Sequence, residues 1–156
     1  MDDPLAGYLH DHWAGSSFAV ELLERPATEF AATPSGNVAR ELLESIQSDR
    51  EVLVGKASTD LYDALGWMAE RVSRFKLKHD DPSGIGTLEA FETIGLGILG
   101  KRGLWEAPEV RQTADTRLGG FDYRFLMGRA EEQFRKANQY RLKLVQSAPS
   151  KPENGS

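Results

Sequence analysis

The chain has 156 residues, a formal net charge of −5 and no cysteine. The lack of cysteine excludes disulfides, thiol nucleophiles and Cys-ligated metal sites, and the acidic balance argues against a nucleic-acid partner. A chain of this length suits one domain, which buries roughly 70% of its unfolded surface. The sequence shows neither the pattern of a secretory signal nor an apolar run long enough to span a bilayer. We therefore expect a cytoplasmic protein with no nucleic-acid and no membrane partner.

Two helices are predicted in the first third of the chain, because apolar residues recur there at alternating spacings of three and four. The first runs from near Asp3 to Pro26, where the proline is expected to end it. Its inward stripe is Leu5, Leu9, His12, Ser16, Ala19 and Leu23. The second is predicted over residues 37–57, with the stripe Leu42, Ile46, Asp49 and Leu53.

Three further helices are predicted over residues 60–78, from 87 to before Pro108, and over 121–146. Their stripes are Leu61, Leu65, Met68, Val72 and Phe75; then Leu88, Phe91, Ile94, Ile98 and Leu104; then Leu126, Ala130, Gln133, Ala137, Tyr140 and Leu144. Short connections favour antiparallel neighbours. The sequence thus predicts an all-α protein, an up-and-down bundle of four to five helices. One domain would span residues 1–146, followed by a disordered polar tail over 147–156.

Polar residues interrupt these stripes near mid-bundle. The first helix contributes His12 and Ser16, the second Asp49, the fourth Glu92, and the fifth Gln133 with Arg129 one turn earlier. Burial of such groups is unfavourable unless they are paired, so we expect them to meet. Antiparallel packing of the first two helices would place the Asp49 carboxylate against one nitrogen of His12.

Two functions are open for such a layer. Most buried polar layers in bundles are architectural, and they set helix register. Alternatively, His12, Ser16, Asp49, Glu92 and Gln133 could bind a small ligand in the bundle core. Ser16 lies one turn from His12, but no oxyanion-hole motif accompanies it, so no catalytic residue is predicted.

One form of the ligand hypothesis is a metal site with a defined set of ligands. Iron, manganese or zinc could be held by one histidine and several carboxylates, namely His12, Asp49, Glu89, Glu92 and Glu132. The Glu-x-x-His pairs of ferritin-type di-iron sites do not occur in the sequence. The primary expectation is therefore a protein without a cofactor.

Glycines and cations add two smaller expectations. Gly95, Gly97, Gly100 and Gly103 fall within one predicted helix, where close approach of a neighbouring helix would explain them. An anion-binding regulator would use Arg50, Lys101, Arg102 or Arg129. Trp13, Trp67 and Trp105 are expected in the core, and any that stays exposed would suit a homodimer interface.

Several segments resemble a family of uncharacterised bacterial helical-bundle proteins that are loosely ferritin-like. They include Leu9-His10-Asp11-His12-Trp13-Ala14-Gly15, Ser48-Asp49-Arg50, Trp67-Met68-Ala69-Glu70-Arg71, Leu88-Glu89-Ala90-Phe91-Glu92 and Arg129-Ala130-Glu131-Glu132-Gln133. The resemblance extends to about Val145 and implies a helical bundle, but it carries over no catalytic or binding residue. The function expected is that of a non-enzymatic structural or interaction bundle with an unknown protein partner. The alternative is a ferritin-like protein that binds a metal or a small ligand.

Overall fold

A computed structural model describes residues 4–54, 84–111, 113–114 and 120–148, with backbone alone for 4–16 and 52–54. These residues form four helices: α1 (Pro4–Glu29), α2 (Pro34–Val54), α4 (Ile85–Arg111) and α5 (Tyr123–Ser147). The described part of the chain contains no strand, so the predicted all-α bundle is confirmed. The helix predicted over 60–78 and most of the predicted tail lie outside the described residues.

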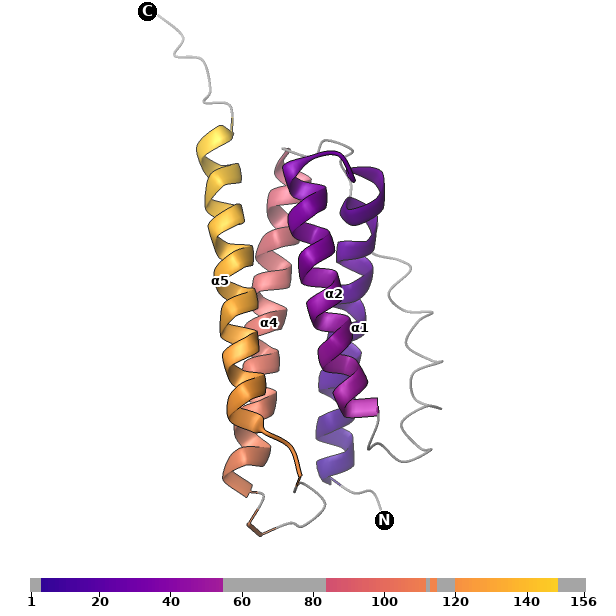
Figure 1. The fold of residues 1–156 in the computed structure, drawn as a ribbon, viewed down its shortest axis with the longest axis vertical. Helices are drawn as coiled ribbons and strands as arrows, with labels where there is room; N and C mark the ends of the chain where they lie inside the picture. Colours follow the sequence, from indigo (N-terminus) through magenta and orange to yellow (C-terminus); the bar gives the residue numbers. More distant parts are fainter. Residues whose placement is uncertain (1–3, 55–83, 112, 115–119, 149–156) are drawn as a thin grey trace, which may run out of the picture.

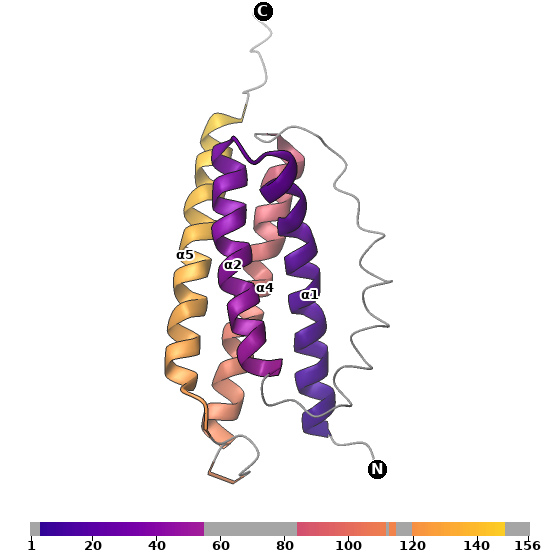
Figure 2. The same ribbon diagram turned by 45° about the vertical axis from the view of Figure 1, so that its right-hand side comes forward.

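The four helices stand side by side with their axes nearly aligned (Figures 1 and 2). α1 packs against α2 and α4, and α5 packs against α4 and α2. Each of these neighbouring pairs is antiparallel, whereas α2 and α4 run in the same direction (Figure 1). Side chains at the middle of α2, α4 and α5 can therefore meet in the interior of the bundle.

The predicted apolar stripes form the core. The main cluster joins buried residues of all four helices, including Leu23, Leu42, Ile46, Phe91, Ile94, Ile98, Ala130 and Ala137. A second cluster, formed by Leu104, Trp105, Tyr123 and Leu126, lies between α4 and α5. Trp105 is thus a core residue, as expected, whereas the side chains of Trp13 and Trp67 lie outside the described residues.

Two helices continue through prolines that were expected to end them. Pro26 lies within α1 and Pro108 within α4, and each stands three residues before the end of its helix. A proline in the last turn removes only one intrahelical hydrogen bond, from the carbonyl four residues earlier. Both rings are buried, so apolar contact offsets that loss. The helix ends predicted at Pro26 and before Pro108 are therefore wrong by about one turn.

Side-chain caps determine where two helices begin. The hydroxyl of Thr33 accepts a hydrogen bond from Gly36 N at 3.2 Å, and Pro34 occupies the first position of α2. The carboxylate of Asp122 accepts one from Phe125 N at 3.0 Å at the start of α5. A capping residue followed by proline is a standard N-terminal signal. It starts α2 three residues before the predicted residue 37.

Among the four glycines of α4 that were expected to pack against a neighbouring helix, Gly95 alone does so within the described residues. A methyl group built on Gly95 would stand 3.5 Å from the ring of Phe134 on α5. Methyl groups on Gly97, Gly100 and Gly103 would meet nothing within 4 Å. For these three positions, the expected neighbouring helix is not found among the described residues.

No helix in the described part of the chain has the length and apolar character needed to cross a membrane.

Gly36 allows the first turn of α2 to lie directly against the end of α1. A methyl group there would overlap the carbonyl group of Phe30 and stand 2.9 Å from Ala31 N. We expect Gly36→Ala to lower the free energy of unfolding by about 1–3 kcal/mol, because backbone atoms would have to shift. Urea unfolding followed by circular dichroism measures this change.

Gly128→Ala provides the matched control, because a methyl group at this α5 position meets nothing within 4 Å. This control should raise the free energy of unfolding by about 0.5–1 kcal/mol through helix propensity. Equal effects of the two substitutions would contradict the close contact at Gly36.

Candidate functional site

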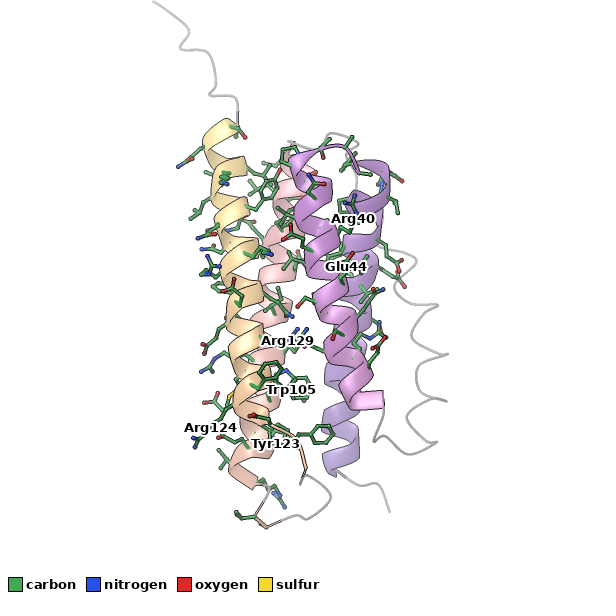
Figure 3. All side chains as sticks on the ribbon, in the orientation of Figure 1. Arg40, Glu44, Trp105, Tyr123, Arg124 and Arg129 are labelled. Carbon is green, nitrogen blue, oxygen red and sulfur yellow. The ribbon has the colours of Figure 1, made fainter. Side chains whose placement is uncertain are left out.

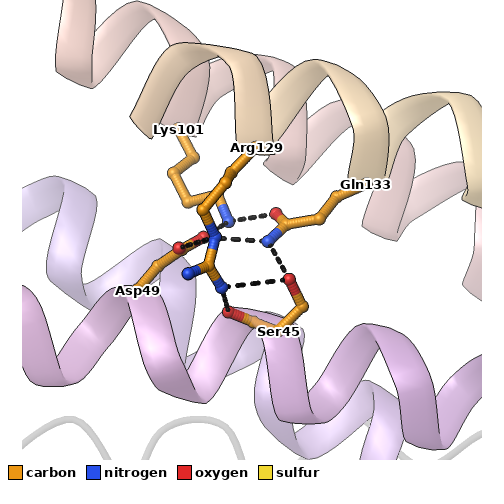
Figure 4. A network of polar contacts seen from close by, with 5 residues as sticks. All are labelled: Ser45, Asp49, Lys101, Arg129 and Gln133. Carbon is orange, nitrogen blue, oxygen red and sulfur yellow. Dashed lines mark hydrogen bonds and ion pairs between the residues drawn. The ribbon is translucent and has the colours of Figure 1, made fainter. Parts of the chain in front are cut away.

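Asp49 is the most deeply buried charged side chain among the described residues, with an exposed fraction of 1%. It lies on the inner face of α2, one turn after Ile46 in the same stripe. A buried carboxylate requires partners. Figure 4 shows that the partners of Asp49 extend toward it from α4 and α5, which lie opposite α2. We refer to Ser45, Asp49, Lys101, Arg129 and Gln133 as the ionic layer.

Lys101 is the partner contributed by α4. Its Nζ donates to Asp49 Oδ2 at 2.6 Å and also to Gln133 Oε1. The ammonium head is nearly enclosed, since 10% of the side chain is exposed. Burial lowers the pKa of Lys101, and the nearby Asp49 carboxylate offsets part of that shift.

Arg129 is the partner contributed by α5, and it links that helix to the backbone of α2. Its Nε lies 2.9 Å from Asp49 Oδ1. Its NH2 group donates to the carbonyl oxygen of Ser45 at 3.1 Å and to the Ser45 hydroxyl at 3.3 Å. Figure 3 shows Arg129 and Trp105 in the interior of the bundle, whereas Arg124 points away from it. The Arg129 side chain is 28% exposed, and its guanidinium also lies over the ring of Phe125.

Gln133 completes the layer because its amide group can donate and accept at once. Nε2 donates to Asp49 Oδ2 at 2.9 Å and to the Ser45 hydroxyl at 2.6 Å, while Oε1 accepts from Lys101. The reverse amide orientation would set oxygen against the carboxylate and nitrogen against the ammonium. The layer therefore fixes the orientation of this side chain.

The ionic layer carries one more positive charge than negative, because two cations share one carboxylate. Asp49 Oδ1 and Trp105 Nε1 are buried polar atoms that form no hydrogen bond among the described residues. The first has Arg129 beside it as an ion pair without hydrogen-bond geometry. Trp105 follows Lys101 by one turn on the same face of α4.

Two of the five predicted ligand-binding residues lie on the inner faces of their helices, as expected. Asp49 and Gln133 are buried, with exposed fractions of 1% and 4%, and they contact each other. His12 and Ser16 belong to α1, but their side chains lie outside the described residues. The proposed pair of His12 with Asp49 therefore stays a prediction.

The placement of Glu92 on the inner seam is wrong. Its side chain is exposed and lies 3.4 Å from Arg141 NH1. The inner stripe of α4 runs through Phe91, Ile94 and Ile98. A residue directly after Phe91 is rotated by about 100° from that stripe.

The metal-ligand set is corrected for the same reason. Glu89 and Glu132 are exposed, and Glu132 pairs with Arg135 on its own helix. No three side chains of histidine, aspartate or glutamate converge on one point within the described part of the chain. Glu89, Glu92 and Glu132 thus do not meet Asp49.

Arg129 meets Asp49, as expected for the polar layer, although the carboxylate was predicted to pair with His12. Lys101 was not predicted as a partner of Asp49 and was considered, together with Arg129, for an anion site alone. A signal for Lys101 existed, because Ile94, Ile98, Lys101 and Trp105 continue one stripe with spacings of four, three and four. A lysine in an apolar stripe indicates a buried charge that needs an acid. Ser45 had no such signal, because its contact with Arg129 includes a backbone carbonyl.

Comparisons with known proteins add no relative: no protein-family model, curated protein or solved structure matches this chain. The resemblance to ferritin-like bundles therefore receives no support from them. The candidate site is interpreted from its own geometry alone.

The buried position of Lys101 has a consequence for the pH dependence of stability. Because its pKa is lowered from 10.5 in the folded chain, the unfolded chain binds more protons in the pH range just below 10.5. The contribution of Lys101 to the free energy of unfolding therefore rises with pH in that range. We expect the wild type to gain stability relative to Lys101→Met between about pH 8 and about pH 10. Parallel urea titrations of the two proteins measure the difference, and a difference independent of pH would contradict the lowered pKa.

Proposed function

We propose that this protein is a non-enzymatic helical bundle of structural or interaction type, in which the ionic layer fixes how the helices are paired and aligned. The proposed role is to present the outer surfaces of the bundle as a rigid body to a protein partner. The observation that carries the proposal is the buried Asp49 carboxylate, which belongs to α2 and is held by cations from α4 and α5.

The contacts of the layer support an architectural role because they are specific to one register. Shifting α5 by one turn, about 5.4 Å, would separate Arg129 and Gln133 from both Ser45 and Asp49. The misaligned bundle would then leave Asp49 with Lys101 alone and would separate Arg129 and Gln133 from their partners, which is unfavourable. An apolar layer would tolerate that shift far better.

The polar groups of the ionic layer also bind mainly to one another. Lys101 binds Asp49 and Gln133, and Gln133 binds Ser45. Catalysis would require a nucleophile with a free base, or an acid and a base directed at a substrate. In the ionic layer, the one carboxylate and the one amine are directed at each other.

The ionic layer contains two cations and one carboxylate, so removing the carboxylate and removing one cation should have unequal effects on stability. We expect Asp49→Ala to lower the free energy of unfolding by about 3–5 kcal/mol, because the nearly enclosed Lys101 and the partly exposed Arg129 would lose their shared carboxylate. Lys101→Met should change it by about 1 kcal/mol or less, because Arg129 still balances Asp49 and methionine keeps much of the stem volume. Chemical denaturation of both variants and of the double variant gives the coupling between them.

Glu132→Ala is the control, since it removes an exposed carboxylate whose partner lies on the same helix. It should leave stability within about 0.5 kcal/mol of the wild type. An Asp49→Ala variant as stable as the wild type would contradict the structural role and point to a site that trades stability for binding.

One observation favours a second candidate, a small polar ligand bound beside the layer. Asp49 Oδ1 and Trp105 Nε1 are a buried acceptor and a buried donor that lack hydrogen bonds among the described residues. Because Arg129 already lies beside Asp49 Oδ1, the group left to satisfy is the Trp105 N–H, and a compound with a hydrogen-bond acceptor would do so. We expect such a compound to appear by native mass spectrometry of untagged protein, and to be lost on denaturation and in Trp105→Phe. Identical native and denatured masses would contradict this candidate.

A further inference from the structure

The outer face of α4 is apolar from Leu96 to Val110. This face, which we call the α4 seam, consists of Leu96, Leu99, Gly100, Gly103, Ala107 and Val110. Except for Leu99, its members follow spacings of four, three, four and three, which is the pattern of a helix that contacts another helix. Leu96 is 72% exposed and Val110 is 76% exposed. No charged residue occurs among these six.

The opposite face of α4 is already buried. Ile94, Ile98 and Trp105 are covered by the bundle, so this helix is apolar on both sides. An exposed apolar face of this kind, opposite a face that is already buried, marks a contact with a further surface. Gly100 and Gly103 strengthen this argument, because each costs about 1 kcal/mol relative to alanine within a helix and has open space in front of it.

We propose that the α4 seam is covered by the α4 seam of a second copy of this chain, packed antiparallel about a twofold axis at Gly100. This inference names a partner for the interaction bundle proposed above, and rests on that proposal. A twofold axis requires a self-complementary surface. Two features of the seam, its shape and its charges, have that property.

The shape fits because a large side chain faces a gap of the right size. With the axis at Gly100, Leu96 lies opposite Gly100, Gly103 and Ala107 of the partner subunit. These three residues have at most a methyl side chain, so they leave a hole for the leucine between two closely approaching backbones. Leu99 lies beside the axis and meets its own copy.

The charges fit because the ends of the seam carry opposite signs. Glu89 and Arg111 lie eleven residues before and after Gly100 on the same side of α4. Both are exposed, and neither forms an ion pair with another described residue. The twofold axis sets Glu89 opposite Arg111 of the partner subunit, and the pair occurs twice. A parallel pairing would instead place like charges together.

The length of α4 sets the crossing angle that this interface needs. Stable interfaces bury about 800 Å² on each partner, and a steep crossing of two helices would bury far less. A shallow crossing of about 20° lets the full helix take part, and its 27 residues span about 40 Å. Ile85, which is 57% exposed, would extend the contact at each end.

Molar mass in solution tests the proposal directly. We expect light scattering after size-exclusion chromatography to give twice 17.3 kDa for the full chain. Leu99→Asp should raise the dissociation constant about 30-fold or more, because two carboxylates would be buried beside the axis. Leu142→Asp on α5 is the matched control, since Leu99 and Leu142 are both 45% exposed. It should leave the dimer unchanged.

A second variant separates loss of the interface from loss of the fold. Gly100→Leu has room within the subunit and improves helix propensity, so the subunit itself should unfold at higher urea concentration. At the axis, two leucines would hold the backbones apart, and the protein should elute as a monomer. A dimer that survives both Leu99→Asp and Gly100→Leu would overturn the assignment to this face.

Charge reversal tests the antiparallel arrangement. Glu89→Arg and Arg111→Glu should each weaken the dimer, and the double variant should restore it, because each swapped residue again faces its opposite. Weakening that the double variant does not relieve would overturn the pairing of these two residues.

Two results would overturn the proposal as a whole. One is a wild-type chain that remains at 17.3 kDa at its highest soluble concentration. The other is a Leu99→Asp variant whose subunit unfolds instead of dissociating as a folded monomer. That result would mean that residues of the same chain cover the seam. Neither result changes the expected loss of stability in Asp49→Ala, so failure of this inference is distinguishable from failure of the proposed function.

Discussion

A single buried carboxylate constrains this bundle more than any other group in its described part. Asp49 lies on α2 but is held by Lys101 from α4 and by Arg129 and Gln133 from α5. Apolar contacts are non-directional and would accept several alignments of these helices. The hydrogen bonds of Asp49 and Gln133 accept one alignment, so the layer selects among packings that the core would find similar in energy.

The outer surface of α4 raises the complementary question of what the bundle contacts. The same helix supplies Lys101 to the interior and Leu96 to the exterior. In its proposed role, the ionic layer aligns α4 with α2 and α5 and thereby also determines the direction in which the α4 seam faces. A fixed position of α4 suits an outer face that contains glycines. Such a face packs with its backbone close to the backbone of the partner helix, so the alignment of the two helices must be accurate.

Sequence reasoning was most successful where periodicity determines the answer. The stripes that contain Leu42, Ile46, Asp49 and Gln133 point inward as expected, because a helix offers one face to the core. It failed for Pro26, because a proline in the last turn removes one hydrogen bond and gains a buried ring. It also failed for Glu92, where a shift by one position moves a residue from the seam to the surface. Which groups reach the Asp49 carboxylate directly could not be derived, because that depends on the relative heights of three helices.

The chain order of the ionic layer has a consequence for synthesis on the ribosome. Asp49 is made early, whereas Arg129 and Gln133 come more than 75 residues later. A newly made pair of α1 and α2 would have to bury an aspartate without those partners, which is unfavourable. The first half of the protein should therefore stay open until α5 emerges, and the four helices should then close in one cooperative step. A nascent chain of this kind would expose its apolar stripes for most of its synthesis.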